Sequence, residues 1–371
     1  MIKNRPKLLM ILHLPPPIHG AAMVGQYIKQ SKLINNNFDC DYINLSTSRK
    51  IDDIGKNSFF KFFVFLKLYI KIITALIKNK YDLCYLTINS KGTGFYKEIL
   101  IVAILKFFNK KIVYHYHNKG VSDNQNNKIL NRLYKFQFKN SKAILLSPLL
   151  YFDIQKYITK NNVYYCPNGI PEIFFNTEKT KKVNNTIQLL FLSNMLISKG
   201  VYTLLKACKI LNDKNIKFEC NFIGDWTKEI SKKDFNAKCK EYNLVNNVIA
   251  HGKKFGDDKK SFFINADIFI FPTFCDCFPL VLLEAMGNQL PVITTNEGAI
   301  PEIIEDGYNG YIVKKNKPAE LADKIEFLIN NPKLRIEMGQ NGLKRYKEKY
   351  TLEKFEHNFV NTLQKVLNEA V

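Results

Sequence analysis

Apolar residues occur in short continuous runs along the chain, and longer stretches with helical spacing separate these runs. In the first half, runs of strand length occupy residues 8–14, 81–86, 112–116, 143–146 and 163–166. Stretches that can be helical lie between them, at about 21–34, 59–79, 95–108, 126–139 and 149–158. Near-continuous apolar strands alternating with helices are typical of a parallel sheet covered on both faces. The first half therefore predicts a doubly wound α/β domain.

The same alternation begins again in the second half. Strands are expected at residues 189–192, 218–223, 248–250, 268–271 and 291–294. Residues 176–185 (NTEKTKKVNN) are polar without an apolar period, which is typical of a linker. We therefore expect two doubly wound domains, at 1–175 and 186–350. The last segment, 351–371, has apolar residues at helical spacing and is expected to form a helix that returns to the N-terminal domain.

Positive charge is concentrated in the first half. The chain has 371 residues with 55 Lys and Arg against 33 Asp and Glu, a formal net charge of +22. Residues 1–170 carry 26 basic and 8 acidic residues, whereas residues 171–371 carry 29 and 25. A strongly cationic half is typical of a protein that meets an anionic surface, either a membrane or a nucleic acid. Nucleic-acid binding is the weaker alternative, because this half has three arginines and no RNA-binding signature.

Residues 59–77 (FFKFFVFLKLYIKIITALI) are the most apolar stretch of the chain. Lys61, Lys67 and Lys71 interrupt it, and a lysine near the bilayer centre costs about 2.5–3.5 kcal/mol, which argues against a membrane span. On a helix, Lys67, Lys71 and Lys78 share one narrow polar stripe. In one interpretation, this stripe faces water and the apolar remainder packs on a sheet. In the other, the helix docks on a membrane, with these lysines and Lys61 at lipid phosphates.

Cysteine and histidine spacing indicates neither a disulfide framework nor a metal site. The eight cysteines form no CxxC pair, and the start (MIKNRP) has no signal-peptide pattern, so reduced thiols in the cytoplasm are expected. No HExxH motif occurs, and Asp39-Cys-Asp41 is interpreted as surface structure beside a strand. Together with the cationic half, this predicts a cytoplasmic protein peripherally associated with the inner membrane, without a metal or other cofactor.

The stretch 271–310 holds the most informative candidate chemistry. The strand before it ends in a loop with Asp276, and Pro279 opens a helix whose residue Glu284 has only apolar neighbours. A buried carboxylate is costly unless it is hydrogen-bonded, and a vicinal diol such as that of ribose could bind both its oxygens. Pairing with a core Lys or Arg is the alternative interpretation. Free amides at the helix N-terminus could receive phosphate, so the pattern describes a nucleotide-sugar site.

Two further loops stand where open α/β sheets bind ligands. Lys199 follows the predicted strand 189–192, although a solvated loop lysine is the alternative interpretation. Residues 15–22 (PPPIHGAA) follow the first strand and open a helix, where backbone amides can meet an anion. Neither GxGxxG nor a P-loop occurs, so dinucleotide and simple NTPase functions lose support.

In combination, these motifs resemble the signature of the retaining glycosyltransferases of family 4. The hallmark of that family is a pair of acids separated by seven residues, matched here by Asp276 and Glu284. The other matching pieces are Gly20, His117, Asn168-Gly169-Ile170, Lys199-Gly200, Glu297-Gly298 and Pro301-Glu302. They recur in the family's order over nearly the whole chain. The resemblance implies the GT-B fold, in which two Rossmann-like domains face each other across a cleft.

The resemblance also implies roles for individual residues. Glu284 would hold the ribose, Lys199 the diphosphate, and Asp276 the hydroxyls of the donor sugar. The residues implied in donor binding are Gly20, Asn194, Lys199, Phe278, Pro279, Leu280 and Glu284, and those implied in catalysis are His117, Asp276 and Lys199. Two positions depart from the family: Asp276 is one methylene shorter than the usual Glu, and Asn194 stands where many members have Arg.

The implied activity is transfer of a hexosyl or N-acetylhexosaminyl group from a nucleotide-diphosphate sugar, with retention of anomeric configuration. A UDP-sugar is expected rather than a GDP-sugar, with no metal required. The cationic half and the 59–77 helix add a polyprenyl-diphosphate-linked saccharide as the expected acceptor, in the synthesis of a bacterial surface glycan such as lipopolysaccharide or capsule. A nucleotide-sugar epimerase of GT-B fold, an inactive scaffold and a basic nucleic-acid-binding protein are the alternatives.

Overall fold

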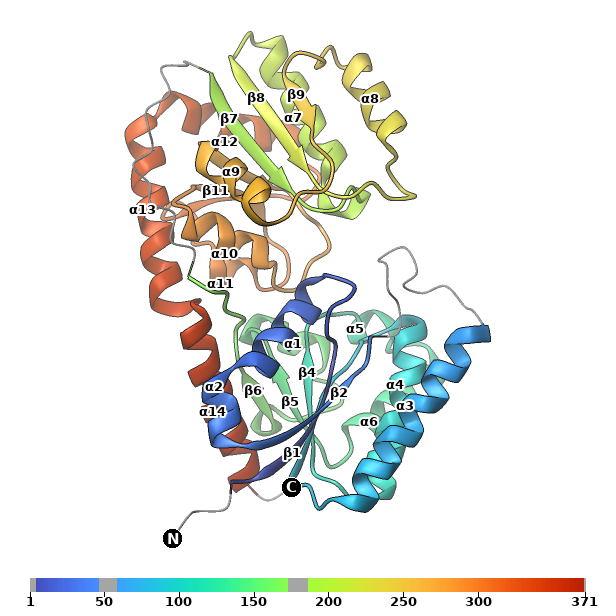
Figure 1. Ribbon diagram of the computed structural model, residues 1–371. Helices are drawn as coiled ribbons and strands as arrows, with labels where there is room; N and C mark the ends of the chain where they lie inside the picture. Colours follow the sequence, from blue (N-terminus) through green and yellow to red (C-terminus); the bar gives the residue numbers. More distant parts are fainter. Residues whose placement is uncertain (1–4, 47–58, 173–185, 370–371) are drawn as a thin grey trace. The chain divides into compact units, whose positions relative to one another are not determined.

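The computed structural model describes residues 5–46, 59–172 and 186–369, without the side chains of residues 59–62. It divides into two compact units (Figure 1). Unit 1 comprises residues 1–169 and 352–371, and unit 2 comprises residues 170–351. The predicted boundary at residue 175 and the predicted linker 176–185 lie outside the described residues.

Unit 1 is a six-stranded parallel sheet in the order β2-β1-β3-β4-β5-β6. Its strands are β1 (Lys7–Leu12), β2 (Asp39–Asn44), β3 (Leu83–Thr87), β4 (Ile112–Tyr116), β5 (Lys142–Leu145) and β6 (Val163–Tyr165). Every residue of β3, β4 and β5 is buried, as the apolar runs predict for strands covered on both faces. The edge strand β2 was not among the predicted runs, because its polar residues alternate with apolar ones and only Ile43 is fully buried.

Helices cover both faces of this sheet (Figure 1). One face carries α3 (Phe59–Lys78), α4 (Gly92–Phe107) and α6 (Lys128–Phe138). The other carries α1 (Gly20–Gln30), α2 (Lys32–Asn37) and α14 (Leu352–Asn368). Short α5 (Val121–Asn124), η2 (Pro148–Asp153) and η3 (Lys160–Asn162) lie in the connections. The predicted helix at 149–158 is wrong in type: η2 is a 3-10 helix, which Ser147 caps by accepting the Leu149 amide hydrogen bond.

The C-terminal helix α14 is part of unit 1. Phe359 packs edge-on against Tyr85 of β3, with ring centroids 5.3 Å apart. At the end of α14, Glu369 pairs with Lys142 of β5, whose side chain is 2% exposed, at 3.0 Å. The helix thus joins the core of a sheet whose strands all lie in the first half of the chain.

Unit 2 repeats the architecture, with the order β12-β11-β10-β7-β8-β9. Its strands are β7 (Ile187–Leu192), β8 (Phe218–Ile223), β9 (Val248–Ala250), β10 (Ile268–Phe271), β11 (Val292–Thr295) and β12 (Gly310–Val313). Its helices are η4 (Ile197–Lys199), α7 (Val201–Asp213), α8 (Lys232–Glu241), α9 (Gly256–Asn265), α10 (Leu280–Gly287), α11 (Ile300–Ile303), α12 (Pro318–Asn330) and α13 (Pro332–Lys349). The five predicted strands are present, and β12 is an additional edge strand. Each unit therefore has the predicted doubly wound α/β fold.

Candidate functional site

In unit 2, the loops after β7 and β10 meet at the carboxyl edge of the sheet. Gly200 makes this approach possible: its φ is +81°, and a Cβ there would lie 2.1 Å from the Pro272 carbonyl oxygen. Lys199, just before it, donates from Nζ to Asp276 Oδ2 at 2.6 Å and to the Cys275 carbonyl at 3.0 Å. The structure therefore brings together two residues, Lys199 and Asp276, that the sequence implied in diphosphate and sugar binding.

The loop that carries Asp276 is held by the loop after β11. The Asp276 amide donates to Glu297 Oε1 at 3.2 Å, and the Glu297 carboxylate, whose side chain is 1% exposed, also pairs with Lys315. Gly298 has φ +55°, and a Cβ there would lie 2.6 Å from the carbonyl oxygens of Asp276 and Cys277. Glu297 and Gly298 both contact backbone atoms of the Asp276 loop, so the position of this loop depends on them.

Glu284 lies on α10 and has a partner that the sequence did not identify. Its Oε1 accepts a hydrogen bond from Lys259 Nζ of α9 at 2.6 Å. The Glu284 side chain is 23% exposed, so it is less buried than its apolar neighbours predict. The alternative interpretation, pairing with a lysine, describes this structure, and the exposed part leaves the carboxylate accessible to a ligand.

The N-terminus of α10 follows the Asp276 loop directly. Pro279 is the cap residue, and the buried Phe278 before it packs edge-on against Tyr350 with ring centroids 6.0 Å apart. Leu280, the first helical residue, is half-buried. First-turn amides lack partners one turn earlier and give this end of a helix a partial positive charge, which favours anions. Asn194, after β7, is half-buried, and within the described chain its side chain makes no hydrogen bond.

The remaining predicted residues lie in unit 1. His117 follows β4, and its ring centroid is 4.2 Å from that of His115. Both ring nitrogens of His117 are shielded from solvent and have no hydrogen-bond partner among the described residues. Burial, followed by the charges of His13 and His19, lowers the pKa of His117 to about 3, so the ring is neutral at physiological pH.

Gly20 begins α1, at the carboxyl edge of the unit 1 sheet. A Cβ built on it would meet no atom within 4 Å, so the residue borders open space. Beside it, His19 caps α1 through Nδ1, which accepts the Ala22 amide at 3.4 Å. Gly20 and His117 therefore both follow strands of the unit 1 sheet, at the edge where α/β sheets bind ligands.

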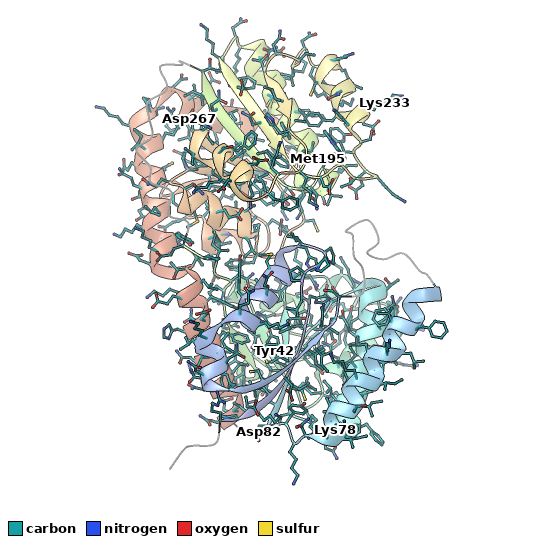
Figure 2. The ribbon with its side chains drawn as sticks, viewed as in Figure 1. Tyr42, Lys78, Asp82, Met195, Lys233 and Asp267 are labelled. Atoms are coloured by element: carbon teal, nitrogen blue, oxygen red, sulfur yellow. The ribbon has the colours of Figure 1, made fainter. Side chains whose placement is uncertain are left out.

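The predicted docking lysines Lys67, Lys71 and Lys78 are exposed on α3, and Lys61 lies outside the described side chains. Figure 2 shows side chains of α3, including Lys78 at its end, projecting away from the sheet. The inner face of α3 buries Leu68, Ile72 and Leu76. The helix is therefore covered on one side by the sheet, and an apolar stripe beside the lysines is exposed: Phe63, Leu66, Ile70 and Ile77.

Two features of the described residues bear on the kind of site. No helix there is both long enough and apolar enough to cross a bilayer. No three His, Cys, Asp or Glu side chains of that part gather closely enough to hold a metal ion.

Comparison with known proteins places unit 2 in context. Residues 172–345, just under half of the chain, match the family model described as Glycosyl transferases group 1. The chain is 32% identical over 173 residues to the capsular polysaccharide biosynthesis glycosyltransferase CapM of Staphylococcus aureus, covering 46% of this chain and 44% of CapM. It is 23% identical over 252 residues to N,N'-diacetylbacillosaminyl-diphospho-undecaprenol alpha-1,3-N-acetylgalactosaminyltransferase of Campylobacter jejuni, covering 61% of each chain. The matches span about half the length of the first curated relatives.

The solved structures extend the likeness to the whole fold. Anabaena Alr3699/HepE in complex with UDP and glucose superposes with a TM-score of 0.73 at 16% identity, covering 97% of this chain and 100% of that one. At this identity the likeness concerns the fold alone. Residues 172–345 thus match the sequence model of group 1 glycosyl transferases, within a chain that has the GT-B fold.

Proposed function

We propose that the protein transfers a sugar from a UDP-sugar to a lipid-linked saccharide, with retention of anomeric configuration. The observation that carries the proposal is the juxtaposition of Lys199, Asp276 and the α10 N-terminus at one sheet edge, within the region that matches group 1 glycosyl transferases. The relatives support the substrate classes: HepE is in complex with UDP and glucose, CapM is named for capsular polysaccharide, and the Campylobacter enzyme for a diphospho-undecaprenol.

The geometry suggests how a donor would be held. In the free protein, Lys199 and Asp276 neutralise each other at 2.6 Å. A diphosphate bound at the α10 N-terminus would replace the carboxylate as partner of Lys199, which releases Asp276 to accept hydrogen bonds from sugar hydroxyls. Glu284, one and a half turns into α10, would accept those of the ribose. Lys199 can therefore change partners on binding without being left unpaired.

Catalysis in this proposal rests on stabilising the leaving group. The bond between the anomeric carbon and the diphosphate oxygen breaks, and a bond to the acceptor oxygen forms on the same face. The acceptor proton passes to the departing diphosphate. Negative charge grows on that diphosphate, where the Lys199 ammonium and the α10 amides are already in place.

A binding experiment tests the donor site. Isothermal titration with UDP, GDP, ADP and CMP should show binding of UDP. In thermal unfolding, a ligand at one hundred times its Kd should add about 2.7 kcal/mol to the free energy of unfolding. We expect Glu284→Ala to abolish UDP binding without lowering Tm. The matched control is Glu326→Ala, which removes a surface carboxylate paired with Lys214 in the same unit. UDP binding unchanged in Glu284→Ala would refute the ribose role, and no binding of any nucleotide would refute the proposed function.

Cys275 offers an independent readout in the same loop. It is the exposed member of the eight cysteines; the others are buried or half-buried. Its carbonyl accepts from Lys199, so a ligand that takes over Lys199 should change access to its thiol. We expect UDP to slow alkylation of Cys275 by iodoacetamide, as followed by peptide mass spectrometry. An alkylation rate unaffected by saturating UDP would place the nucleotide elsewhere.

We further propose that unit 1 docks on the cytoplasmic face of the inner membrane through the α3–α4 surface. We define it as the exposed apolar residues of both helices with the flanking lysines: Phe63, Leu66, Lys67, Ile70, Lys71, Ile77, Lys78, Tyr96, Leu100 and Phe107. The helices are neighbours, because Tyr69 of α3 donates to the Lys97 carbonyl of α4 at 3.1 Å. Phe107 is 83% exposed. Apolar side chains beside lysines suit an anionic bilayer, where each basic residue adds about 1 kcal/mol.

Cosedimentation with anionic and neutral vesicles tests this surface. The triple change of Lys67, Lys71 and Lys78 to Glu should weaken binding to anionic vesicles about a hundredfold, because three attractions of about 1 kcal/mol each are lost. The matched control changes three exposed lysines of α8 to Glu: Lys232, Lys233 and Lys240, of which Lys233 is marked in Figure 2. Equal losses in both variants would show that net charge alone drives binding and would refute the α3–α4 surface.

A further inference from the structure

The lysine that meets Glu284 comes from a different helix. Lys259 lies on α9, before β10, and Glu284 lies on α10, after it. Their Nζ and Oε1 atoms are 2.6 Å apart, and both side chains are about three-quarters buried. A charged pair so shielded is screened less than a surface pair, so its geometry matters more.

The ammonium of Lys259 also contacts a buried aromatic ring. Its Nζ lies 5.8 Å from the ring centroid of Phe263, one turn later on α9. Phe263 is buried and stacks on Phe269 of β10, with centroids 6.0 Å apart and ring planes at 21°. An aromatic face attracts a cation, and this one belongs to the rigid core of unit 2. Lys259 is therefore held between a fixed ring and the Glu284 carboxylate.

Glu284 has one carboxylate oxygen left for a ligand. Val281, Leu283 and Ala285 beside it offer no side-chain donor, and Asn288 Nδ2 donates to the backbone carbonyl of Glu284. Within the described residues, Oε1 accepts from Lys259 and Oε2 accepts no hydrogen bond. A carboxylate restrained at one oxygen presents the other in a defined direction, whereas a free one samples several rotamers.

We propose that Lys259 is a positioning residue for nucleoside binding: by holding Oε1, it aims Oε2 of Glu284 at the ribose hydroxyls of the donor. This inference rests on the proposed function and deepens it, because it adds a residue from α9 to a site otherwise made by the loops after β7 and β10. In this arrangement Lys259 supports the nucleoside part of the donor, and Lys199 the diphosphate.

Comparing uridine with UDP separates this role from two others. If Lys259 positions Glu284, Lys259→Met should weaken uridine and UDP by the same factor. If Lys259 binds phosphate, UDP alone should weaken. If Lys259 competes with ribose for Glu284, both ligands should bind more tightly. Either of the last two results would overturn the inference.

The experiment is isothermal titration of the full chain with uridine and with UDP. We expect Lys259→Met to weaken both about tenfold, the lower end for a charge-assisted hydrogen bond, and Lys259→Arg to restore most of the affinity. The matched control is Lys206→Met, which removes an exposed lysine from α7. In a Glu284→Gln background, Lys259→Met should have little further effect on uridine, because the carboxylate that it aims is gone.

The outcomes distinguish the inference from the function on which it rests. If the wild-type chain binds UDP and Glu284→Ala abolishes that binding, but Lys259→Met binds both ligands as the wild type does, only the inference fails. If the wild-type chain binds neither ligand, both fail. We expect equal Tm values for Lys259→Met and the wild type. If Tm falls enough to explain the weakened binding, the role of Lys259 is structural and the inference is wrong.

Discussion

Glu98 of α4 provides a sharp test of the electrostatics of unit 1. Its side chain is 6% exposed and accepts hydrogen bonds from the Asn89 amide and from Asn89 Nδ2, both at 2.6 Å. Its Oε1 lies 3.7 Å from His13 Nε2, at the end of β1. Burial raises the pKa of Glu98 to about 8, although the hydrogen bonds from Asn89 oppose the shift. The perturbation is Glu98→Gln, which removes the titrating group.

The sign of the effect follows from proton binding in the two states. Between the ordinary pKa of 4.5 and a folded pKa of about 8, the folded chain keeps a proton on Glu98 that the unfolded chain has released. The free energy of unfolding therefore falls as pH rises through this window, by about 1.4 kcal/mol per pH unit. The contribution is complete below pH 4.5 and is lost as pH rises towards 8. Between pH 5.5 and 7.5 the wild-type chain should lose about 2.7 kcal/mol from this group.

The variant shows only a constant cost over the same range. A glutamine side chain is neutral and does not titrate, so the interactions that Gln forms with Asn89 in Glu98→Gln are the same at every pH. The titrations of His13 and His117 are common to both proteins and cancel to first order in the difference. The destabilisation caused by Glu98→Gln should therefore shrink by about 2.7 kcal/mol between pH 5.5 and 7.5.

Hydrogen exchange can read this difference in unit 1 alone. Opening free energies of peptides from β1, β3 and β4, corrected for the intrinsic pH dependence of amide exchange, are compared between wild type and variant. Trp226, the one tryptophan of the chain, lies in unit 2, so its fluorescence in urea serves as an internal reference. Stability profiles that run parallel from pH 5.5 to 7.5 would refute the raised pKa of Glu98.

Three further substitutions test the packing. Glu369→Ala should lower the urea midpoint of unfolding, because it leaves the buried Lys142 ammonium without its carboxylate partner, and Lys142→Met in that background should recover the loss; no recovery would contradict this explanation. Gly298→Ala should weaken UDP binding in calorimetry at least tenfold, because its Cβ would displace the Asp276 loop; wild-type affinity would show that the loop position is unimportant. Asp153→Ala should lower Tm by several degrees, because the Asp153 carboxylate accepts three backbone amides of residues 120–122; an unchanged Tm would argue against this role.

Both sheets could be predicted because their central strands are buried on both faces. Such strands appear in the sequence as continuous apolar runs, and β4, β8 and β10 have the predicted bounds. The edge strands β2 and β12 were missed because partly exposed residues dilute their apolar pattern, whereas the edge strands β6 and β9 keep short apolar runs and were predicted. A continuous apolar run, rather than the place of a strand in the sheet, thus decided which strands could be predicted.

The candidate site was predictable where its residues lie close to a motif. Asp276 and Lys199 lie in loops that follow strands, and Glu284 lies in the helix that follows the Asp276 loop, so their spacing in the chain reflects their place at the sheet edge. Lys259 and Lys315 could not be predicted, because each meets its carboxylate through a contact between different elements. Nothing in the local sequence distinguishes these lysines from the solvated lysines nearby.

In helix α3, too, the local sequence pattern predicted one feature and the packing of the helix decided another. Its spacing alone placed Lys67, Lys71 and Lys78 on one stripe, because a helix has a known period. Which apolar stripe would be buried depended on how the helix lies on the sheet and beside α4. The backbone fixes the period of a helix or strand, so the sequence alone shows which residues share a face. The choice of which face is buried and which lysine meets which acid arises only when separate elements pack together, because those contacts join residues that the sequence keeps apart.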